Sequence, residues 1–122
     1  MVTSTGIDVV EISRISTDIL RFGQRFIDRI LAPSEREMLK GRHDVEDFIA
    51  GRFAAKEAII KALGVYLENR PPLNRIEIVR SGRRPPEVTL PDDIIAKLNG
   101  ARCHISISHE RHYAVAVAIF DQ

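Results

Sequence analysis

The chain has 122 residues, enough for one globular domain that buries roughly two-thirds of the surface its unfolded form exposes. Hydrophobic residues make up 44% and charged residues 29%, which is ordinary for a soluble globular protein. The formal net charge of +1 argues against a dedicated nucleic-acid binder, so we expect no nucleic-acid partner. No repeat or linker divides the chain, and we predict a single domain over residues 1–122.

Cysteine content and hydropathy indicate the compartment. Cys103 is the only cysteine, so no intramolecular disulfide and no cysteine-based zinc cage can form. The N-terminal residues lack the basic head and long apolar run of a signal peptide, and no apolar stretch approaches the ~20 residues that span a bilayer. We therefore expect a cytoplasmic protein with no membrane partner.

Residues 6–10 form a short β-rich run with Asp8 in its middle. An unpaired carboxylate is costly to bury, so Asp8 either points outward, caps the following helix or has a partner. Residues 11–22 have helical apolar spacing, and Gly23 either lies within this helix or ends it before a second short helix over 24–31. If the helix continues, Arg14, Arg21 and Arg25 share a face, which is either solvated or a dock for an acidic partner.

The longest helix is predicted from an N-cap at Asp44 to Gly64, a glycine expected to end it in a left-handed conformation. A shorter helix before it should begin with a capping box formed by Ser34 and Glu37. Glu57 and Lys61 are four residues apart and lie beside the apolar stripe of the long helix. They form either a surface ion pair or the wall of an anion and metal site.

The second half of the chain alternates turns with β-rich runs. We expect a strand over 73–79, a basic turn over 81–86, a strand over 87–89 and a helix over 91–98. A final hairpin joins strands 102–108 and 113–120, and alternate alanines in its second strand permit close approach of a helix or another subunit. The expected fold class is α+β, with an antiparallel sheet packed against the long central helix.

Three patches are not required by folding alone: Asp8, the pair Glu57 and Lys61, and the hairpin end at residues 108–110. Two carboxylates suit Mg²⁺, which prefers oxygen ligands and is commonly shared with substrate phosphates. Lys61 could then contact a phosphate, and His109 could contact substrate or transfer a proton.

Three motifs together resemble a known family: Gly6-Ile7-Asp8-Val9-Val10-Glu11-Ile12-Ser13-Arg14-Ile15, Gly51-Arg52-Phe53-Ala54-Ala55-Lys56-Glu57-Ala58 with Lys61-Ala62-Leu63-Gly64, and Ser106-Ile107-Ser108-His109. In order and spacing they resemble holo-acyl-carrier-protein synthase, the small bacterial class of 4'-phosphopantetheinyl transferases. The resemblance covers essentially the whole chain. It implies the 4'-phosphopantetheinyl transferase fold and transfer of 4'-phosphopantetheine from coenzyme A to a serine of apo acyl carrier protein, with release of adenosine 3',5'-bisphosphate.

The resemblance also implies residue roles. Asp8 and Glu57 match the family's Mg²⁺ ligands, and Lys61 matches the lysine that contacts the coenzyme A phosphates. The implied catalytic residues are Asp8, Glu57, Lys61 and His109, and the implied contacts to coenzyme A are Lys61, Gly64, Arg84, Pro85, Ser108 and His109. The base that accepts the serine proton stays open between a carboxylate, directly or through water, and His109.

The family assembles as a homotrimer with active sites at subunit interfaces, and Arg14 matches a position in its carrier-docking helix. Arg21 and Arg25 would extend that patch. One departure is the turn before Pro85, where many members have Gly-Lys-Pro and this chain has Arg83 and Arg84. Arg84 keeps the cation, but Arg83 lacks the conformational freedom of glycine.

Two other functions are compatible with the residues alone. A metal-dependent phosphohydrolase could use the same acids. A small binding module could use the basic first helix to dock an acidic partner, in which case the acids would be dispensable.

Overall fold

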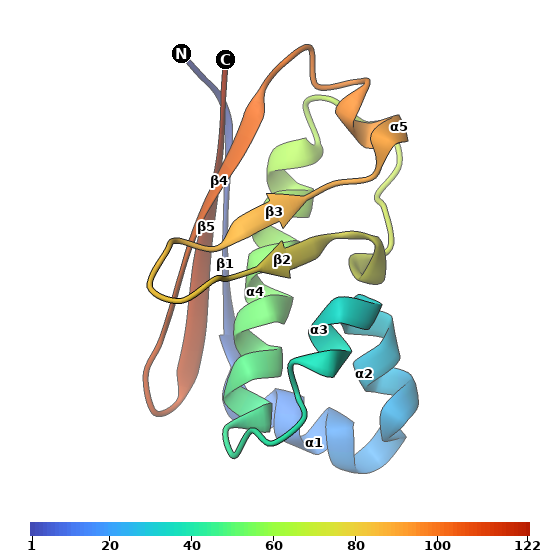
Figure 1. Ribbon diagram of the computed structural model, residues 1–122, viewed down its shortest axis with the longest axis vertical. Coiled ribbons are helices and arrows are strands. Elements are labelled where there is room, and N and C mark those ends of the chain that lie inside the picture. The colour runs from blue at the N-terminus through green and yellow to red at the C-terminus, as the bar shows by residue number, and fades with distance from the viewer.

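The computed structural model describes residues 1–122 (Figure 1). Its strands are β1 (Val2–Glu11), β2 (Glu77–Val79), β3 (Glu87–Thr89), β4 (Arg102–His109) and β5 (Tyr113–Asp121). Its helices are α1 (Ile12–Phe22), α2 (Gln24–Ile30), α3 (Pro33–Glu37), α4 (Val45–Leu63) and α5 (Asp92–Ile95), with one 3-10 turn, η1 (Leu73–Arg75). The expected α+β class, with an antiparallel sheet against a long helix, is confirmed.

The main sheet has the strand order β1-β5-β4, with both pairs antiparallel. Asp8 pairs with Ala116 of β5, and Ala116 pairs with Ile107 of β4, so β1 and β4 are the two edges of the sheet. Figure 1 shows α4 along one face of this sheet, α1 to α3 around the lower end of α4, and the β2–β3 hairpin crossing in front. The helix α4 therefore has one flank at the β1 edge of the sheet and the other at the β4 edge. It can place different side chains at each edge.

Small residues bring α4 close to the sheet. Ala114, Ala116 and Ala118 are 0–2% exposed and occupy the face of β5 that packs against α4. The alternate alanines thus accommodate a helix of the same chain, one of the two partners their spacing allowed. Gly6 on β1 lies even closer, because a Cβ atom there would collide with the carbonyl oxygen of Ala58.

Replacing Gly6 with Ala should therefore destabilise the fold, because the colliding atom is backbone and cannot rotate away. We expect a loss of about 2–3 kcal/mol in the free energy of unfolding, measured by urea denaturation. Gly51→Ala is the control, since its Cβ would meet only the Ile107 Cγ2 at 3.3 Å and alanine favours helix. Equal stability of the two variants would contradict this packing.

The other face of the sheet is largely uncovered. Ile7 and Val9 of β1 are 63% and 62% exposed, and Tyr113 and Val115 of β5 are 47% and 36% exposed. The register places Ile7 beside Val117 and Val9 beside Val115, so these side chains form one apolar surface. A contiguous apolar surface of this kind is typical of a protein interface.

Two predicted features of helix ends are wrong, although the long helix does end before Gly64. The capping box of Ser34 and Glu37 does not form, because Pro33 already starts α3 and the Ala32 N–H donates to Glu35 Oε1 at 2.7 Å. Gly64 is right-handed, with φ −57° and ψ −23°, because the chain continues into a turn in which Tyr66 N–H donates to the Leu63 carbonyl. Asp44 does precede α4, but its side chain binds Arg42 instead of capping the helix.

Three other element boundaries either decide between alternatives that the sequence left open or correct a predicted range. Gly23, at φ +61°, separates α1 from α2, so the basic residues do not share one continuous helix face. The strand predicted over 73–79 covers only Glu77–Val79, because residues 73–75 form the 3-10 turn η1. The helix predicted over 91–98 is regular only at Asp92–Ile95, and Asn99 and Gly100 end this segment with positive φ as expected.

Candidate active site

Asp8 and Lys61 meet at the open edge of β1. The Lys61 Nζ donates to Asp8 Oδ1 at 3.0 Å and to the Ile7 carbonyl at 2.9 Å. The Asp8 side chain is 17% exposed and that of Lys61 is 55% exposed. Of the alternatives for Asp8, the structure therefore selects a partnered carboxylate, because a mostly buried charge requires a counter-ion.

Glu57 lies one helical turn before Lys61 but does not pair with it. Its Oε1 accepts a hydrogen bond from Arg70 Nη2 at 2.5 Å, and its side chain is 17% exposed. Glu57 and Lys61 therefore do not form the surface ion pair that was one of the two alternatives, since each side chain has a different partner. Asp8, Glu57 and Lys61 are called the β1-edge cluster below.

The donor set of the β1-edge cluster fits magnesium. Asp8 and Glu57 supply two carboxylates, each neutralised by a flexible cation that is more than half exposed. No group of three or more His, Cys, Asp or Glu side chains is placed to hold a metal ion. Magnesium is commonly bound by one or two carboxylates together with waters and substrate phosphates, so two such ligands are sufficient.

A second basic site lies at the opposite edge of the sheet. A groove of about 450 Å³ lies between the first half of α4, the β2–β3 turn and the end of β4. Four arginines line it, and we call it the arginine groove: Arg42, Arg52, Arg80 and Arg83. His109 and Pro85 also line it, as do the acids Asp44 and Asp47.

The arginines of the groove differ in how they are held. Arg42 and Arg52 both lie over the ring of Phe48, each with its Cζ 4.5 Å from the ring centroid. Arg42 also binds both carboxylate oxygens of Asp44, which lowers the pKa of Asp44. Arg80 and Arg83 are exposed and pair with no carboxylate. These two are free to bind an anion.

A buried ionic network supports the groove from inside. Lys56 is fully buried, and its Nζ donates to the Ile30 carbonyl at 2.6 Å and to Glu35 Oε1 at 2.5 Å. Glu35 Oε2 accepts from the Ile78 N–H at 3.1 Å and lies 3.7 Å from Arg52 Nε. Burial lowers the pKa of Lys56, and the neighbouring Glu35 carboxylate opposes that shift. One carboxylate thus joins α4, α3 and β2, whose extension carries Arg80.

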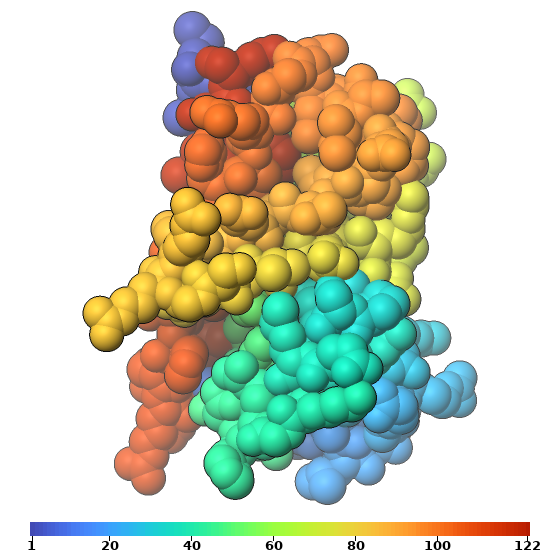
Figure 2. All heavy atoms as spheres, in the orientation of Figure 1, coloured from blue at the N-terminus to red at the C-terminus, as the bar shows by residue number.

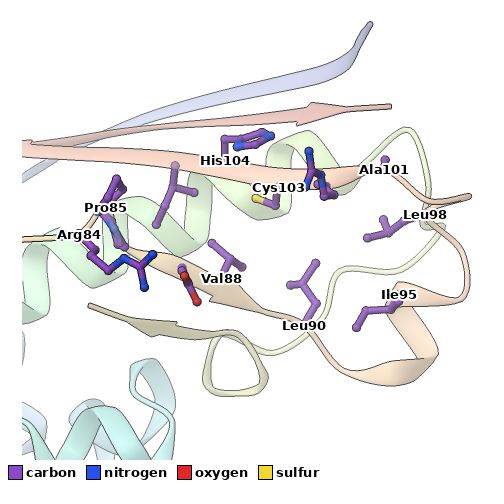
Figure 3. Close-up of a pocket in the computed structure, with 13 residues that line it drawn as sticks. Arg84, Pro85, Val88, Leu90, Ile95, Leu98, Ala101, Cys103 and His104 are labelled. Atoms are coloured by element: carbon purple, nitrogen blue, oxygen red, sulfur yellow. The ribbon is translucent and has the colours of Figure 1, made fainter. Parts of the chain in front are cut away.

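A larger hollow lies elsewhere, between β3, α5 and β4, with a volume of about 700 Å³ (Figure 3). Its lining is mainly apolar: Val88, Leu90, Ile95, Leu98, Ala101, Cys103 and Ile105. Figure 3 shows Arg84 and Pro85 at one end of it. The β1-edge cluster and His109 do not line this hollow. Burial raises the pKa of the Cys103 thiol to about 12, so this cysteine is not a nucleophile at neutral pH.

The predicted site residues therefore fall into separate places. Lys61 binds Asp8, and Glu57 lies one helical turn before Lys61, while Pro85 and His109 lie in the arginine groove. Arg84 lines the apolar hollow, and Gly64 follows the last residue of α4. Ser108 is exposed on the outer face of β4, in register with Val115. The assignment of all these residues to a functional site remains a prediction.

Helix geometry shows that the two groups face opposite sides of α4. Lys61 follows Arg52 by nine residues, which is two and a half turns at about 3.6 residues per turn. Lys61 points to the β1 edge, where it binds Asp8, and Arg52 lines the groove at the β4 edge. A single chain therefore carries two half-sites, the β1-edge cluster and the arginine groove, that do not face one another.

The turn with the unusual arginine pair needs no glycine at Arg83. Its left-handed residue is Gly82, with φ +58°, and the Arg84 N–H donates to the Ser81 carbonyl at 3.1 Å. Arg83 has a negative φ that any residue adopts. Arginine at this position is therefore compatible with the turn.

The three arginines of the predicted basic patch are all exposed, but they do not lie on one continuous helix. Arg14 and Arg21 on α1 and Arg25 on α2 are exposed, and the bend at Gly23 divides them between two helices. Arg29 on α2 is exposed as well, as are Leu20 and Phe22 of α1, at 88% and 53%. Figure 2 shows α1 and α2 at the lower right of the molecule, away from the β3–α5 region.

Comparison with known proteins identifies the family. A family model described as the 4'-phosphopantetheinyl transferase superfamily matches residues 4–118. The chain belongs to this family. The resemblance carried by the three sequence motifs is thereby confirmed.

Individual 4'-phosphopantetheinyl transferases agree over the full length. The holo-[acyl-carrier-protein] synthase of Koribacter versatilis is 39% identical over 124 residues, covering 99% of each chain. The crystal structure of the Neisseria meningitidis holo-[acyl-carrier-protein] synthase has a TM-score of 0.89 at 30% identity and covers 100% of both chains. That of Helicobacter pylori, in complex with coenzyme A, has a TM-score of 0.83 at 37% identity and covers 96% of this chain and 99% of its own.

As a member of this transferase family, the chain is an enzyme, and the binding-module interpretation is excluded as its principal function. None of its helices combines the length and apolar character needed to cross a membrane. The arginine groove and the Glu35 network are the parts of this transferase that sequence reasoning missed. A signal for the network was present, because Lys56 falls on the apolar stripe of α4 between Phe53 and Ile60.

Proposed function

We propose that the chain is a magnesium-dependent holo-[acyl-carrier-protein] synthase that transfers 4'-phosphopantetheine from coenzyme A to a serine of apo acyl carrier protein. The observation that carries the proposal is the β1-edge cluster, where two mostly buried carboxylates lie beside a lysine in a chain of this family. The Helicobacter pylori relative with coenzyme A bound supports the donor.

The reaction replaces the phosphoanhydride bond of coenzyme A with a phosphodiester bond to the carrier serine. The carrier serine oxygen forms a bond to the phosphorus that bears pantetheine, and the bond from that phosphorus to the bridging oxygen of the diphosphate breaks. Adenosine 3',5'-bisphosphate leaves with the bridging oxygen, and the serine proton passes to a base. The candidate bases are a carboxylate of the β1-edge cluster, acting directly or through water, and His109 in the arginine groove.

The residues of the β1-edge cluster have complementary roles. Asp8 and Glu57 would hold Mg²⁺, which when bound offsets charge on the diphosphate oxygens and on the leaving group. Lys61 binds a phosphate oxygen through the ammonium that Asp8 now holds. The backbone carbonyl of Ile7 keeps this ammonium at the β1 edge while its partner changes.

The arginine groove supplies the second half of the donor site. Coenzyme A carries a 3'-phosphate in addition to its diphosphate, and guanidinium groups are the strongest side-chain ligands for phosphate. Arg80 and Arg83 are exposed and have no acidic partner, so their guanidinium groups are free to donate to a phosphate. This free donor capacity supports a nucleotide-binding role for the groove.

The two half-sites face opposite sides of α4, so we propose that an active site forms where the β1 edge of one copy meets the groove of another. The family resemblance gives a homotrimer for this assembly. The exposed apolar face of β1 and β5 provides a surface on which copies can associate.

The exposed arginines of α1 and α2 are proposed to dock the acidic carrier. Reversing the charge with Arg14→Glu should raise the KM for the carrier by about tenfold and leave kcat nearly unchanged, because docking depends on steering and rim ion pairs. Steady-state kinetics at two salt concentrations would measure this, since screening weakens surface attraction. Lys97→Glu, an exposed lysine just after α5, is the control, and an equal effect there would contradict docking at α1.

The transfer itself is tested by incubating the purified chain with Mg²⁺, coenzyme A and apo carrier. Intact-mass spectrometry should show a phosphopantetheine adduct on the carrier, with adenosine 3',5'-bisphosphate released in equal amount. A carrier whose acceptor serine is replaced by alanine is the control. Absence of an adduct would contradict the proposal, and free phosphopantetheine released without carrier would instead identify a phosphohydrolase.

A further inference from the structure

Arg70 forms an ion pair with Glu57, one of the two proposed metal ligands. It lies in the loop after α4, and its Nη2 is 2.5 Å from Glu57 Oε1. The Glu57 side chain is 17% exposed and that of Arg70 is 57% exposed. Glu57 therefore already has a counter-ion from its own chain.

The two cations of this region are anchored differently. Lys61 projects from the rigid helix α4 and has two acceptors, Asp8 and the Ile7 carbonyl. Arg70 projects from a loop, is mostly exposed, and makes no hydrogen bond other than that to Glu57. Arg70 is therefore the cation that can leave its carboxylate at little cost to the rest of the fold.

We propose that Arg70 is a built-in counter-ion of Glu57 that competes with the divalent cation and moves to a donor phosphate when metal and coenzyme A bind together. The proposal rests on the proposed function, since it takes Glu57 as a metal ligand. A metal bound to Glu57 would lie within a few ångströms of the guanidinium, and two positive charges so close repel unless an anion separates them. A phosphate of coenzyme A is such an anion, and arginine binds phosphate well.

This exchange makes metal binding depend on coenzyme A. Without coenzyme A, Arg70 holds Glu57 and weakens metal binding. With coenzyme A present, the displaced guanidinium gains a phosphate partner, so the penalty disappears. Because coupling between two ligands is reciprocal, the metal should raise the affinity for coenzyme A by the same factor.

The test compares metal affinity in the wild-type protein and in Arg70→Met, using Mn²⁺ as a probe followed by electron paramagnetic resonance. Titrations are run without coenzyme A and with saturating coenzyme A, with no carrier present so that nothing is consumed. We expect Arg70→Met to bind Mn²⁺ about 5- to 10-fold more tightly without coenzyme A. The factor by which coenzyme A tightens Mn²⁺ binding should shrink accordingly.

Two further variants make the comparison specific. Arg70→Lys keeps the positive charge and should restore most of the wild-type behaviour. Arg75→Met removes another half-exposed arginine, one paired with Asp93 at 2.8 Å, and should leave both Mn²⁺ affinities unchanged. Unfolding curves for all variants should agree, because Arg70 is bound to one carboxylate only.

The outcomes separate this proposal from the proposed function. If Glu57→Gln weakens Mn²⁺ binding but Arg70→Met leaves it unchanged or weaker, the metal site stands and the role of Arg70 is overturned. If Mn²⁺ binding does not depend on Glu57 at all, the metal site is overturned and the proposal for Arg70 with it.

Discussion

Glu57→Gln and Asp8→Asn should each lower kcat/KM for the transfer by about 10²–10⁴-fold, because each removes a negative charge from the cluster proposed to hold the metal and position the diphosphate. Both substitutions preserve shape. They leave Arg70 and Lys61 without a counter-ion, but both cations are more than half exposed and stay solvated. The loss should therefore appear in turnover and not in stability. Steady-state kinetics and unfolding curves on the same preparations would measure both.

The matched control for these acids is Asp93→Asn. Asp93 is also ion-paired to an arginine, Arg75, but lies at the start of α5 and outside both half-sites. Its substitution should change kcat/KM by less than about twofold. If Glu57→Gln retained turnover close to that of the Asp93 control, the assignment of the β1-edge cluster as the catalytic centre would fail.

Glu35→Ala should cause the largest loss of stability, about 3–5 kcal/mol or a fall of about 10–20 °C in Tm. The substitution leaves the Lys56 ammonium, which is fully buried, without its carboxylate. It also removes the acceptor of the Ala32 and Ile78 N–H groups, and a buried donor without a partner carries the full cost of desolvation. Thermal unfolding followed by circular dichroism would measure the effect.

Glu37→Ala is the control for this prediction, because Glu37 pairs only with exposed Lys40 and should cost less than about 0.5 kcal/mol. If Glu35→Ala does not fold, the double variant Glu35→Leu with Lys56→Met can be measured instead. Replacing both charges together removes the unpaired ammonium and should recover much of the stability. Similar stability of Glu35→Ala and Glu37→Ala would show that the buried network is not important for the fold.

Local patterns were sufficient to predict most of the fold. The helical spacing of apolar residues predicted α4, the alternation in the last two strands predicted the β4–β5 hairpin, and Gly23 was recognised as a possible break. The errors lie where a tertiary contact or a neighbouring residue decides. Pro33 starts α3 ahead of Ser34, and Gly64 continues right-handed into a turn although glycine permits a left-handed end.

The site was only partly predictable, because its contacts join residues that are far apart in the sequence. The three motifs pointed to Asp8, Glu57 and Lys61, but not to Arg70, which binds Glu57 across 13 positions of sequence. The arginine groove combines α4 with the β2–β3 turn, and no spacing rule brings Arg52 and Arg83 together. Lys56 did carry a local signal, since a charge within an apolar stripe has to be paired in the core, and Glu35 is its partner.

The central claim is that the β1-edge cluster of one copy works with the arginine groove of another, and mixing two inactive variants tests it most directly. One variant is Glu57→Gln and the other combines Arg80→Glu with Arg83→Glu, which reverses two exposed charges that have no acidic partner. Each variant alone has a defect in every site. After dissociation and random reassembly, about a quarter of the interfaces join two intact half-sites, so about a quarter of wild-type activity should return. If native mass spectrometry shows mixed oligomers and activity stays at the level of the separate variants, the shared site is contradicted.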